Sequence, residues 1–185
     1  MKEFAKRLLS LGESAVVLDT ETTGLGHLDE VLEIGVLSLA GEVLIDQLVR
    51  PSVVESWRDA QLVHGIGPEA VADSPTLAAV LPALRDVVAG KTVVVYNADY
   101  DRRLLYQSAH ACGADVLDWL FLDEVDWRDV MDPYARHWGE RRRNGYRWQK
   151  LTVACQQQGI TVADSHRAIG DCRMTLALLQ KLAGG

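Results

Sequence analysis

Residues 15–25 read AVVLDTETTGL, and this stretch indicates what kind of sheet the chain can build. The apolar run that opens it and ends in an acid predicts a buried strand over residues 15–20. Threonines and a glycine follow at 22–24 and predict a turn where this strand ends. Two acidic side chains therefore stand near the end of a strand, and open α/β sheets bind their ligands in the crevice at strand ends.

Asp19 and Glu21 are the two acids of this stretch. Because side chains alternate along an extended chain, both carboxylates point to one side of the sheet, with their Cα atoms ~7 Å apart. Carboxylates are the ligands that hard divalent cations such as Mg²⁺ and Mn²⁺ prefer, so the pair could serve neighbouring metal positions. Taken alone, the pattern is equally compatible with two ordinary acids at a strand end.

Two further acids and one histidine could complete a site. Asp101 follows the apolar run KTVVVY of residues 91–96, so it is expected near the start of a helix beside the first strand. Asp171 lies near the start of a C-terminal amphipathic helix, and His166 precedes it by five residues, which would put the two on different faces of one continuous helix. We therefore expect His166 in the loop before that helix, where it could accept a proton. The alternatives without a catalytic role are that Asp101 is an acid stabilised by the helix macrodipole and that His166 is a structural or exposed histidine.

The other segments alternate between strands and helices, which predicts an α/β fold with a mixed sheet and helices on its faces. No repeat or linker divides the chain, so residues 1–185 are expected to form one domain. One strand is expected within residues 115–131, Pro82 is expected to kink or end its helix, and Asn97 could bond the backbone at a strand-to-helix turn. The other expected strands are 31–40, 42–49 and 91–96, and the expected helices are 1–14, 77–89, 100–111, 133–139, 148–158 and 168–182.

The composition is typical of a soluble globular protein, with 48% apolar and 24% charged residues in a chain of 185. No apolar run approaches the ~18 residues of a membrane span, and the N-terminus does not resemble a secretion signal, so no membrane partner is expected. Three cysteines without metal-ligand spacing favour buried thiols in a reducing compartment. We therefore expect a cytoplasmic protein.

The net charge of −7 is unusual for a protein that binds nucleic acid, because phosphates attract basic surfaces. Its distribution is uneven, since residues 134–150 carry six basic residues against one acid, a net +5, and the rest of the chain carries −12. Residues 140–145 are expected to form a charged loop. The arginines of Arg141–Arg143 could hold a single-stranded backbone with Tyr146 or Trp148 stacking on bases, or the loop could simply be solvated.

Three strings occur in the order DTETTG at 19–24, NADYD at 97–101 and HRAIGD at 166–171. They resemble the three motifs of the DEDDh family of 3′-to-5′ exonucleases, which includes ribonuclease T, exonuclease X and the proofreading epsilon subunit of bacterial replicative polymerase. The stretch LVHGI at 62–66 is also similar to a family element. The resemblance covers about residues 15–182 and implies a ribonuclease H-like fold, a five-stranded mixed sheet flanked by helices, in a single exonuclease domain.

The resemblance also implies roles for the residues of these motifs. Four carboxylates would hold two divalent metal ions, Mg²⁺ or Mn²⁺, and a histidine would take the proton from the attacking water. The expected product is a nucleoside 5′-monophosphate released from a 3′ end, with Leu25 as a wedge against the last base. The implied catalytic residues are His166, Asp19, Glu21, Asp101 and Asp171, of which the four acids are the metal ligands, and the implied substrate-binding residues are Thr22, Thr23, Gly24, Leu25, His64 and Asn97.

The preferred substrate is the 3′ end of a nucleic acid, with single-stranded DNA favoured over RNA. An exoribonuclease with the same chemistry remains an alternative, because the sequence identifies no residue that would contact the 2′-hydroxyl. A non-catalytic binding subunit is disfavoured, since all four acids and the histidine are present. The chain ends at Gly185, directly after the last expected helix, which favours a free-standing monomer or homodimer, although a proofreading role with a polymerase partner is possible.

Overall fold

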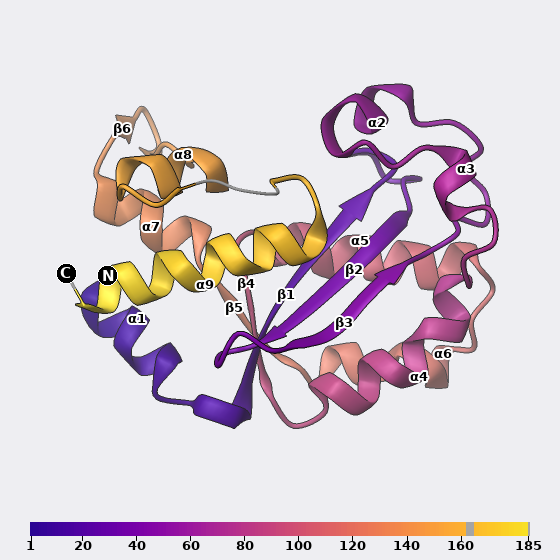
Figure 1. Ribbon diagram of the computed structural model, residues 1–185, viewed down its shortest axis with the longest axis horizontal. Helices are drawn as coiled ribbons and strands as arrows, with labels where there is room; N and C mark the ends of the chain where they lie inside the picture. Colours follow the sequence, from indigo (N-terminus) through magenta and orange to yellow (C-terminus); the bar gives the residue numbers. More distant parts are fainter. Residues whose placement is uncertain (162–164, 185) are drawn as a thin grey trace.

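The computed structural model describes residues 1–161 and 165–184, so Gly185, on which the expectation about the chain end rests, lies outside the described residues. Its centre is a five-stranded mixed sheet with the strand order β3-β2-β1-β4-β5 (Figure 1). β1 is antiparallel to β2 and parallel to β4, which places β1 at the middle of the sheet. The strands are β1 Ala15–Thr22, β2 Val31–Ser38, β3 Val43–Leu48, β4 Thr92–Val95 and β5 Asp126–Asp129.

Helices cover both faces of this sheet, as the sequence predicts. Figure 1 shows α9 crossing one face with α1 beside it, while α4 and α5 lie on the other face. The helices are α1 Lys2–Leu9, α2 Arg58–His64, α3 Pro68–Val71, α4 Leu77–Val88, α5 Ala98–Ala111, α6 Val116–Trp119, α7 Met131–Trp138, α8 Leu151–Gln157 and α9 Ala168–Gly184, with 3₁₀ turns η1 Gly12–Ser14 and η2 Leu120–Asp123.

The period of two along β1 builds a separate core on each face of the sheet. Val16 and Leu18 pack into the cluster that includes apolar residues of α4 and α5, whereas Val17 packs into the cluster beneath α9. All three side chains are fully buried, and burying one valine or leucine contributes roughly 1.5–3 kcal/mol. The same alternation decides to which side each polar residue at the end of β1 points.

Gly35 of β2 lets α9 touch the sheet. This glycine is the partner of Asp19 in the β1–β2 register. A Cβ atom at position 35 would lie 2.7 Å from the carbonyl carbon of Ala168 and 2.8 Å from the backbone nitrogen of Ile169, so any larger residue would push the helix away. The absence of a side chain therefore brings the N-terminal end of α9 directly beside the end of β1.

Several local predictions differ from the structure. Pro82 does not end its helix but lies inside α4, because the apolar face of that helix is held in the core on both sides of the proline, and the alternative of a kink stays a prediction. The expected charged loop over 140–145 contains a short hairpin, β6 Arg141–Arg142 and β7 Gly145–Tyr146, in which the chain turns at residues 143–144 and Gly145 then adopts a φ of +101°, which favours glycine. The helix expected from residue 148 begins only at Leu151.

The compositional expectations can be compared with the described residues. The three cysteines are free thiols, and Cys155 and Cys172 are buried as expected. Cys112 is only half-buried, because α5 ends there at the surface. Within residues 1–161 and 165–184, no helix combines the length and the apolar character needed to cross a membrane.

Candidate active site

Four polar side chains at the carboxyl end of β1 alternate between the two faces of the sheet. Asp19 and Glu21 continue the side of Val17 and meet an acid of α9. Thr20 and Thr22 point to the other side and hydrogen-bond side chains of α5. One strand therefore presents carboxylates to one helix and hydroxyl groups to another.

Asp19, Glu21 and Asp171 form an acidic cluster, in which each residue offers a carboxylate oxygen and these oxygens lie within 4.8 Å of one another. Asp171 reaches the cluster from the first turn of α9. Oxygen donors at this separation fit a hard divalent cation such as Mg²⁺ or Mn²⁺. The family resemblance implied that these three residues act together, and the structure brings their carboxylate oxygens together.

Burial and mutual repulsion make this cluster electrostatically costly without a cation. Burial, followed by the charges of Asp101 and Asp171, raises the pKa of Asp19 well above its usual range. Burial is also the main cause that raises the pKa of Glu21 to about 8 and that raises the pKa of Asp171. A bound divalent ion would stabilise the charged form of each group, so the electrostatics agree with the donor set.

Asp101 lies beside the cluster but is not a member of the 4.8 Å set. It is buried in the first turn of α5, and its Oδ1 accepts hydrogen bonds from the backbone N–H of Thr20 at 2.9 Å and from the Thr20 hydroxyl at 2.7 Å. Burial raises the pKa of Asp101 to about 7. After burial, the charge of Asp101 is the largest cause of the raised pKa of Asp19. The two carboxylates therefore interact, although Asp101 is bound by Thr20, which points to the other side of β1.

His166 lies in the loop two residues before α9, as predicted from its spacing to Asp171. Its side chain is exposed, and its backbone N–H donates to Asp171 Oδ1 at 3.1 Å. The φ angle of His166 is +65°, a left-handed conformation that costs a residue with a side chain about 1–3 kcal/mol. Burial raises the pKa of Asp171, and the backbone N–H and the charge of His166 partly oppose this rise, so the imidazole lies within electrostatic reach of the acidic cluster.

Glu33 fixes the residues that follow His166, and sequence reasoning did not single it out for this. Its side chain is 1% exposed and pairs with the guanidinium of Arg167, while its Oε2 accepts the backbone N–H of Ala168 at 2.8 Å. Glu33 is also the register partner of Glu21. The sequence held one signal for this role. Glu33 is the single acid inside the apolar strand VLEIGVL, and a buried acid is almost always paired with a basic or hydrogen-bonding group.

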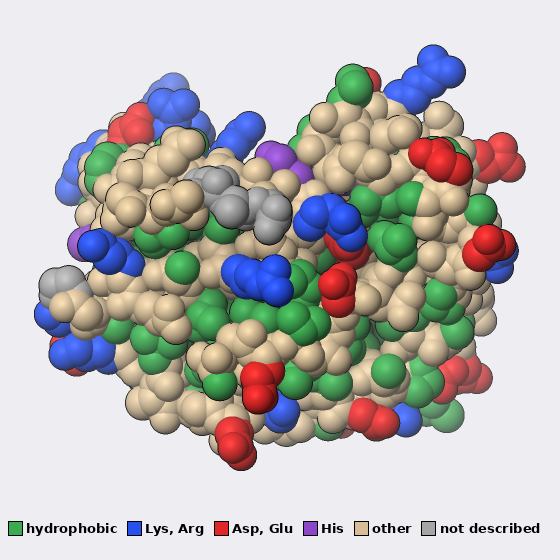
Figure 2. All heavy atoms as spheres, in the orientation of Figure 1, with side chains coloured by type: hydrophobic (Ala, Val, Ile, Leu, Met, Phe, Trp, Pro, Cys, Tyr) green, Lys and Arg blue, Asp and Glu red, His purple; other side chains and the backbone are tan. Residues whose placement is uncertain are grey.

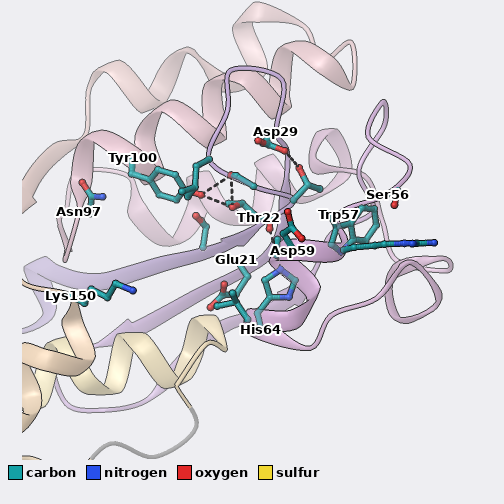
Figure 3. Close-up of a pocket in the computed structure, with 17 residues that line it drawn as sticks. Glu21, Thr22, Asp29, Ser56, Trp57, Asp59, His64, Asn97, Tyr100 and Lys150 are labelled. Atoms are coloured by element: carbon teal, nitrogen blue, oxygen red, sulfur yellow. Dashed lines mark hydrogen bonds between the residues drawn. The ribbon is translucent and has the colours of Figure 1, made fainter.

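A cavity of about 910 Å³ opens beside the acidic cluster, and Glu21 is the member of the cluster that lines it. Figure 3 shows Glu21, Thr22 and His64 around this cavity, with Lys150 pointing toward it from the start of α8. Leu25 is 81% exposed at its rim. The cavity is lined by every residue predicted to bind substrate, namely Thr22, Thr23, Gly24, Leu25, His64 and Asn97.

Hydrogen bonds to α5 and to Asp29 hold the wall that these residues form. The Tyr100 hydroxyl donates to the carbonyl of Gly24 at 2.9 Å and lies 2.6 Å from the Thr22 hydroxyl. A Cβ atom at Gly24 would lie 2.7 Å from a carboxylate oxygen of Asp29, so a side chain there would displace the carboxylate that accepts bonds from the Thr23 hydroxyl and the Gly26 N–H. The turn after β1 is thus tied to the helix that carries Asp101.

His64 shapes the cavity wall with both ring nitrogens in use. Nδ1 accepts the backbone N–H of Ile66 at 3.0 Å, which leaves the proton on Nε2 to be donated to the carbonyl of Thr22 at 3.2 Å. Burial lowers the pKa of His64, so the neutral ring is favoured. This histidine supports the end of β1, whereas His166, beside the acidic cluster, has an exposed side chain.

Asn97 lines the cavity at the N-terminus of α5, but its side chain makes no bond to the helix backbone. The expectation of such a bond is wrong because a carboxylate from β5 already occupies that place. Asp129 Oδ1 accepts the N–H of Ala98 at 3.2 Å. Asn97 therefore keeps its amide available to the cavity, where Figure 3 draws it beside Tyr100.

Comparison with known proteins assigns the chain to a class. The family model described as Exonuclease, RNase_T, matches residues 16–179. The chain therefore belongs to the exonuclease family, whose members are nucleases. Among sequence relatives, it is 37% identical over 177 residues to "Uncharacterized exonuclease CP81" of Escherichia phage 186, an alignment that covers 95% of this chain and 91% of that protein.

A second relative is a polymerase. The chain is 28% identical over 177 residues to "DNA polymerase III PolC-type" of Caldanaerobacter subterraneus, an alignment that covers 94% of this chain. It spans only 12% of that polymerase, so the likeness concerns one segment of a much longer protein.

Solved exonuclease structures share the fold. Exonuclease X in complex with 5′ overhanging duplex DNA matches with a TM-score of 0.67 and 25% identity, covering 92% of this chain and 91% of that one. E. coli exonuclease I in complex with a dT13 oligonucleotide matches with a TM-score of 0.69 and 18% identity, covering 91% of this chain and 40% of that one. The five-stranded sheet with flanking helices is thus the ribonuclease H-like fold of these exonucleases.

Proposed function

We propose that this protein is a 3′-to-5′ exonuclease that acts on single-stranded DNA ends and releases nucleoside 5′-monophosphates. The observation that carries the proposal is the acidic cluster of Asp19, Glu21 and Asp171 at the edge of an open cavity, in a chain of the exonuclease family. We further propose that residues 1–185 act as one domain in the cytoplasm.

In this proposal, Asp19, Glu21, Asp101 and Asp171 hold two divalent ions, Mg²⁺ or Mn²⁺, which when bound stabilise charge on the attacking and leaving oxygens. His166 accepts a proton from the attacking water. The water oxygen forms a new bond to phosphorus while the bond from phosphorus to the 3′ oxygen breaks, and that oxygen takes up a proton from the solvent. The exposed loop position of His166 gives its ring the freedom to approach the water.

The cavity would hold the terminal nucleotide. The backbone at Thr22–Gly24 is fixed by hydrogen bonds, so it can present its polar groups in one arrangement. Leu25, exposed at the rim, would act as the wedge against the last base, and the neutral His64 and the amide of Asn97 would contact its other sides. DNA is favoured over RNA because both structural relatives described above are bound to DNA.

A second candidate is the same chemistry as a proofreading module that works with a polymerase. The match to a PolC-type polymerase over 94% of this chain favours it. Purified protein that runs as a monomer or homodimer and trims DNA without a polymerase would favour the free-standing enzyme.

The direct test uses matched single-stranded DNA, single-stranded RNA and duplex DNA, each labelled at the 5′ end, with Mg²⁺ or Mn²⁺. We expect single-stranded DNA to shorten one nucleotide at a time from its 3′ end, with 5′-monophosphates as the released product. Faster shortening of RNA would assign the exoribonuclease instead. Internal cuts, or no shortening of any substrate, would overturn the proposal.

Cation binding should be detectable from the way in which Tm depends on pH. The pKa of Glu21 is raised from 4.5 to about 8, so the folded state binds a proton more tightly than the unfolded chain does. The contribution of Glu21 to folding is therefore present at acidic pH and is lost as pH rises through this window. In EDTA we expect Tm to fall as pH rises from about 5 to about 8.

Because a cation binds the charged carboxylates, Mn²⁺ should raise Tm more near pH 8 than near pH 6. Glu21→Gln should flatten the dependence of Tm on pH and reduce the increase that Mn²⁺ causes, whereas Glu42→Gln, an exposed acid between β2 and β3, should change neither. An equal increase in Tm at both pH values would speak against a cation site at Glu21.

A further inference from the structure

Two smaller hollows extend the active-site cavity toward the β6–β7 hairpin. The first, of about 490 Å³, shares Asn97 and Tyr100 with the active-site cavity. The second, of about 310 Å³, shares Asp132 and Trp148 with the first. Together they form a groove, here called the upstream groove, that leads from the active-site cavity to Arg142 of the hairpin.

The hairpin end of the upstream groove is basic, and part of its charge is unpaired. Arg136 and Arg147 have acidic partners, Asp132 and Glu140. In contrast, among the residues that the structure describes, Arg142 and Arg143 have no acidic group within 4.0 Å. Figure 2 shows basic side chains gathered on the lobe that contains β6 and α8, beside a hollow in the surface. Arg142 is within electrostatic reach of Glu140, but that carboxylate is already bonded to Arg147, so it offsets only part of this charge. Neighbouring arginines repel each other, so an anion bound there would stabilise them.

Trp148 lies between the two hollows and is 64% exposed. Within the described part of the chain, it has no aromatic ring contact. An exposed aromatic face beside a basic groove is the arrangement on which single-stranded bases stack without sequence preference. Lys150, two residues further on, lines the active-site cavity, so one short segment joins the hairpin to the proposed reaction centre.

Acids in the middle of the groove limit where phosphates can run. Asp132 is paired with Arg136, and Asp129 accepts backbone N–H groups, including that of Asp132, but Asp99 is exposed on the same hollow. A phosphate backbone is therefore expected to follow the arginine side, with its bases turned toward Trp148. Both the charge and the exposed ring suit a single strand better than a duplex, whose bases are not available for stacking.

We propose that the hairpin and Trp148 hold the single strand upstream of the 3′-terminal nucleotide, with Arg142 and Arg143 on phosphates and the indole stacked on a base. The inference rests on the proposed function, because the strand that it guides is the proposed substrate. It goes beyond that function by assigning a second surface, outside the acidic cluster, that would make binding depend on the length of the strand.

The test measures binding without turnover, by fluorescence anisotropy of a labelled dT20 strand in EDTA over a series of salt concentrations. The slope of log affinity against log salt is ~0.7 per phosphate contact for a single strand, so Arg142→Gln/Arg143→Gln should reduce it by about 1.4. Trp148→Ala should weaken binding about 5- to 150-fold, the range found for the loss of one stacked base. Arg7→Gln/Arg85→Gln removes two exposed arginines elsewhere, on α1 and α4, and should change neither quantity.

A kinetic comparison supplies the second readout. For Trp148→Ala, the ratio of kcat/KM on dT20 to kcat/KM on a dinucleotide should fall at least about fivefold, as the weakest stacking loss implies, and the ratio should also fall for Arg142→Gln/Arg143→Gln. An unchanged salt slope, or an equal loss on both substrates, would overturn the upstream groove. If no strand is shortened by the wild-type protein but the hairpin variants still lose affinity in EDTA, the proposed function fails while the binding surface stands.

Discussion

Asp19→Asn is expected to reduce nucleotide release by about 10³-fold or more. Asp19 belongs to the acidic cluster, and burial together with the charges of Asp101, Asp171 and Glu21 raises its pKa. Replacing it by a neutral side chain of the same shape removes the charge that would hold a cation on this side of β1. A loss of ~4 kcal/mol of transition-state stabilisation, within the several kcal/mol that metal ions supply, corresponds to ~10³-fold in rate.

The same substitution should leave the fold intact. The raised pKa of Asp19 means that its charge opposes folding when no cation is bound, so Asp19→Asn should keep or increase Tm in EDTA near pH 8. Single-turnover release of nucleotide and thermal melting measure the two effects. Asp86→Asn, an exposed acid on α4, is the matched control and should change neither. Wild-type release by Asp19→Asn would remove the acidic cluster from the mechanism.

His166→Asn should reduce kcat by about 10²–10⁴-fold, the usual range for loss of a general base. Asparagine is the substitution of choice because it tolerates a positive φ better than alanine, and His166 has a φ of +65°. The backbone N–H that donates to Asp171 is retained, so the loop before α9 should keep its geometry. The affinity for Mn²⁺, measured by the shift in Tm, should change much less than kcat.

The pH profile separates a base from a merely structural histidine. Because protonated imidazole cannot accept a proton, wild-type kcat should fall as pH drops through the range in which histidine titrates, about 5 to 8. His166→Asn should lose this dependence while the part caused by cation binding remains. His110→Asn, an exposed histidine in the last turn of α5, should behave as wild type. A wild-type rate that is constant across this range would argue for another proton acceptor.

Local sequence patterns predicted most of the secondary structure and the direction of the key side chains. The apolar run before Asp19 became the central strand, and the period of two sent Asp19 and Glu21 to the same face. The five-residue spacing placed His166 outside α9. These predictions succeed because they depend on backbone geometry over a few residues. The β6–β7 hairpin was missed because two-residue strands produce no periodic signal.

The sequence by itself determined which residues could carry chemistry and on which element each would lie. Only the tertiary structure decided which of them meet. Asp171 joins Asp19 because Gly35 lets α9 approach the sheet, whereas Asp101, at the other face of β1, is held by Thr20. The physical reason is that a side chain's direction follows from its neighbours along the chain, whereas the distance between segments some 80 to 150 residues apart follows from how helices and strands pack.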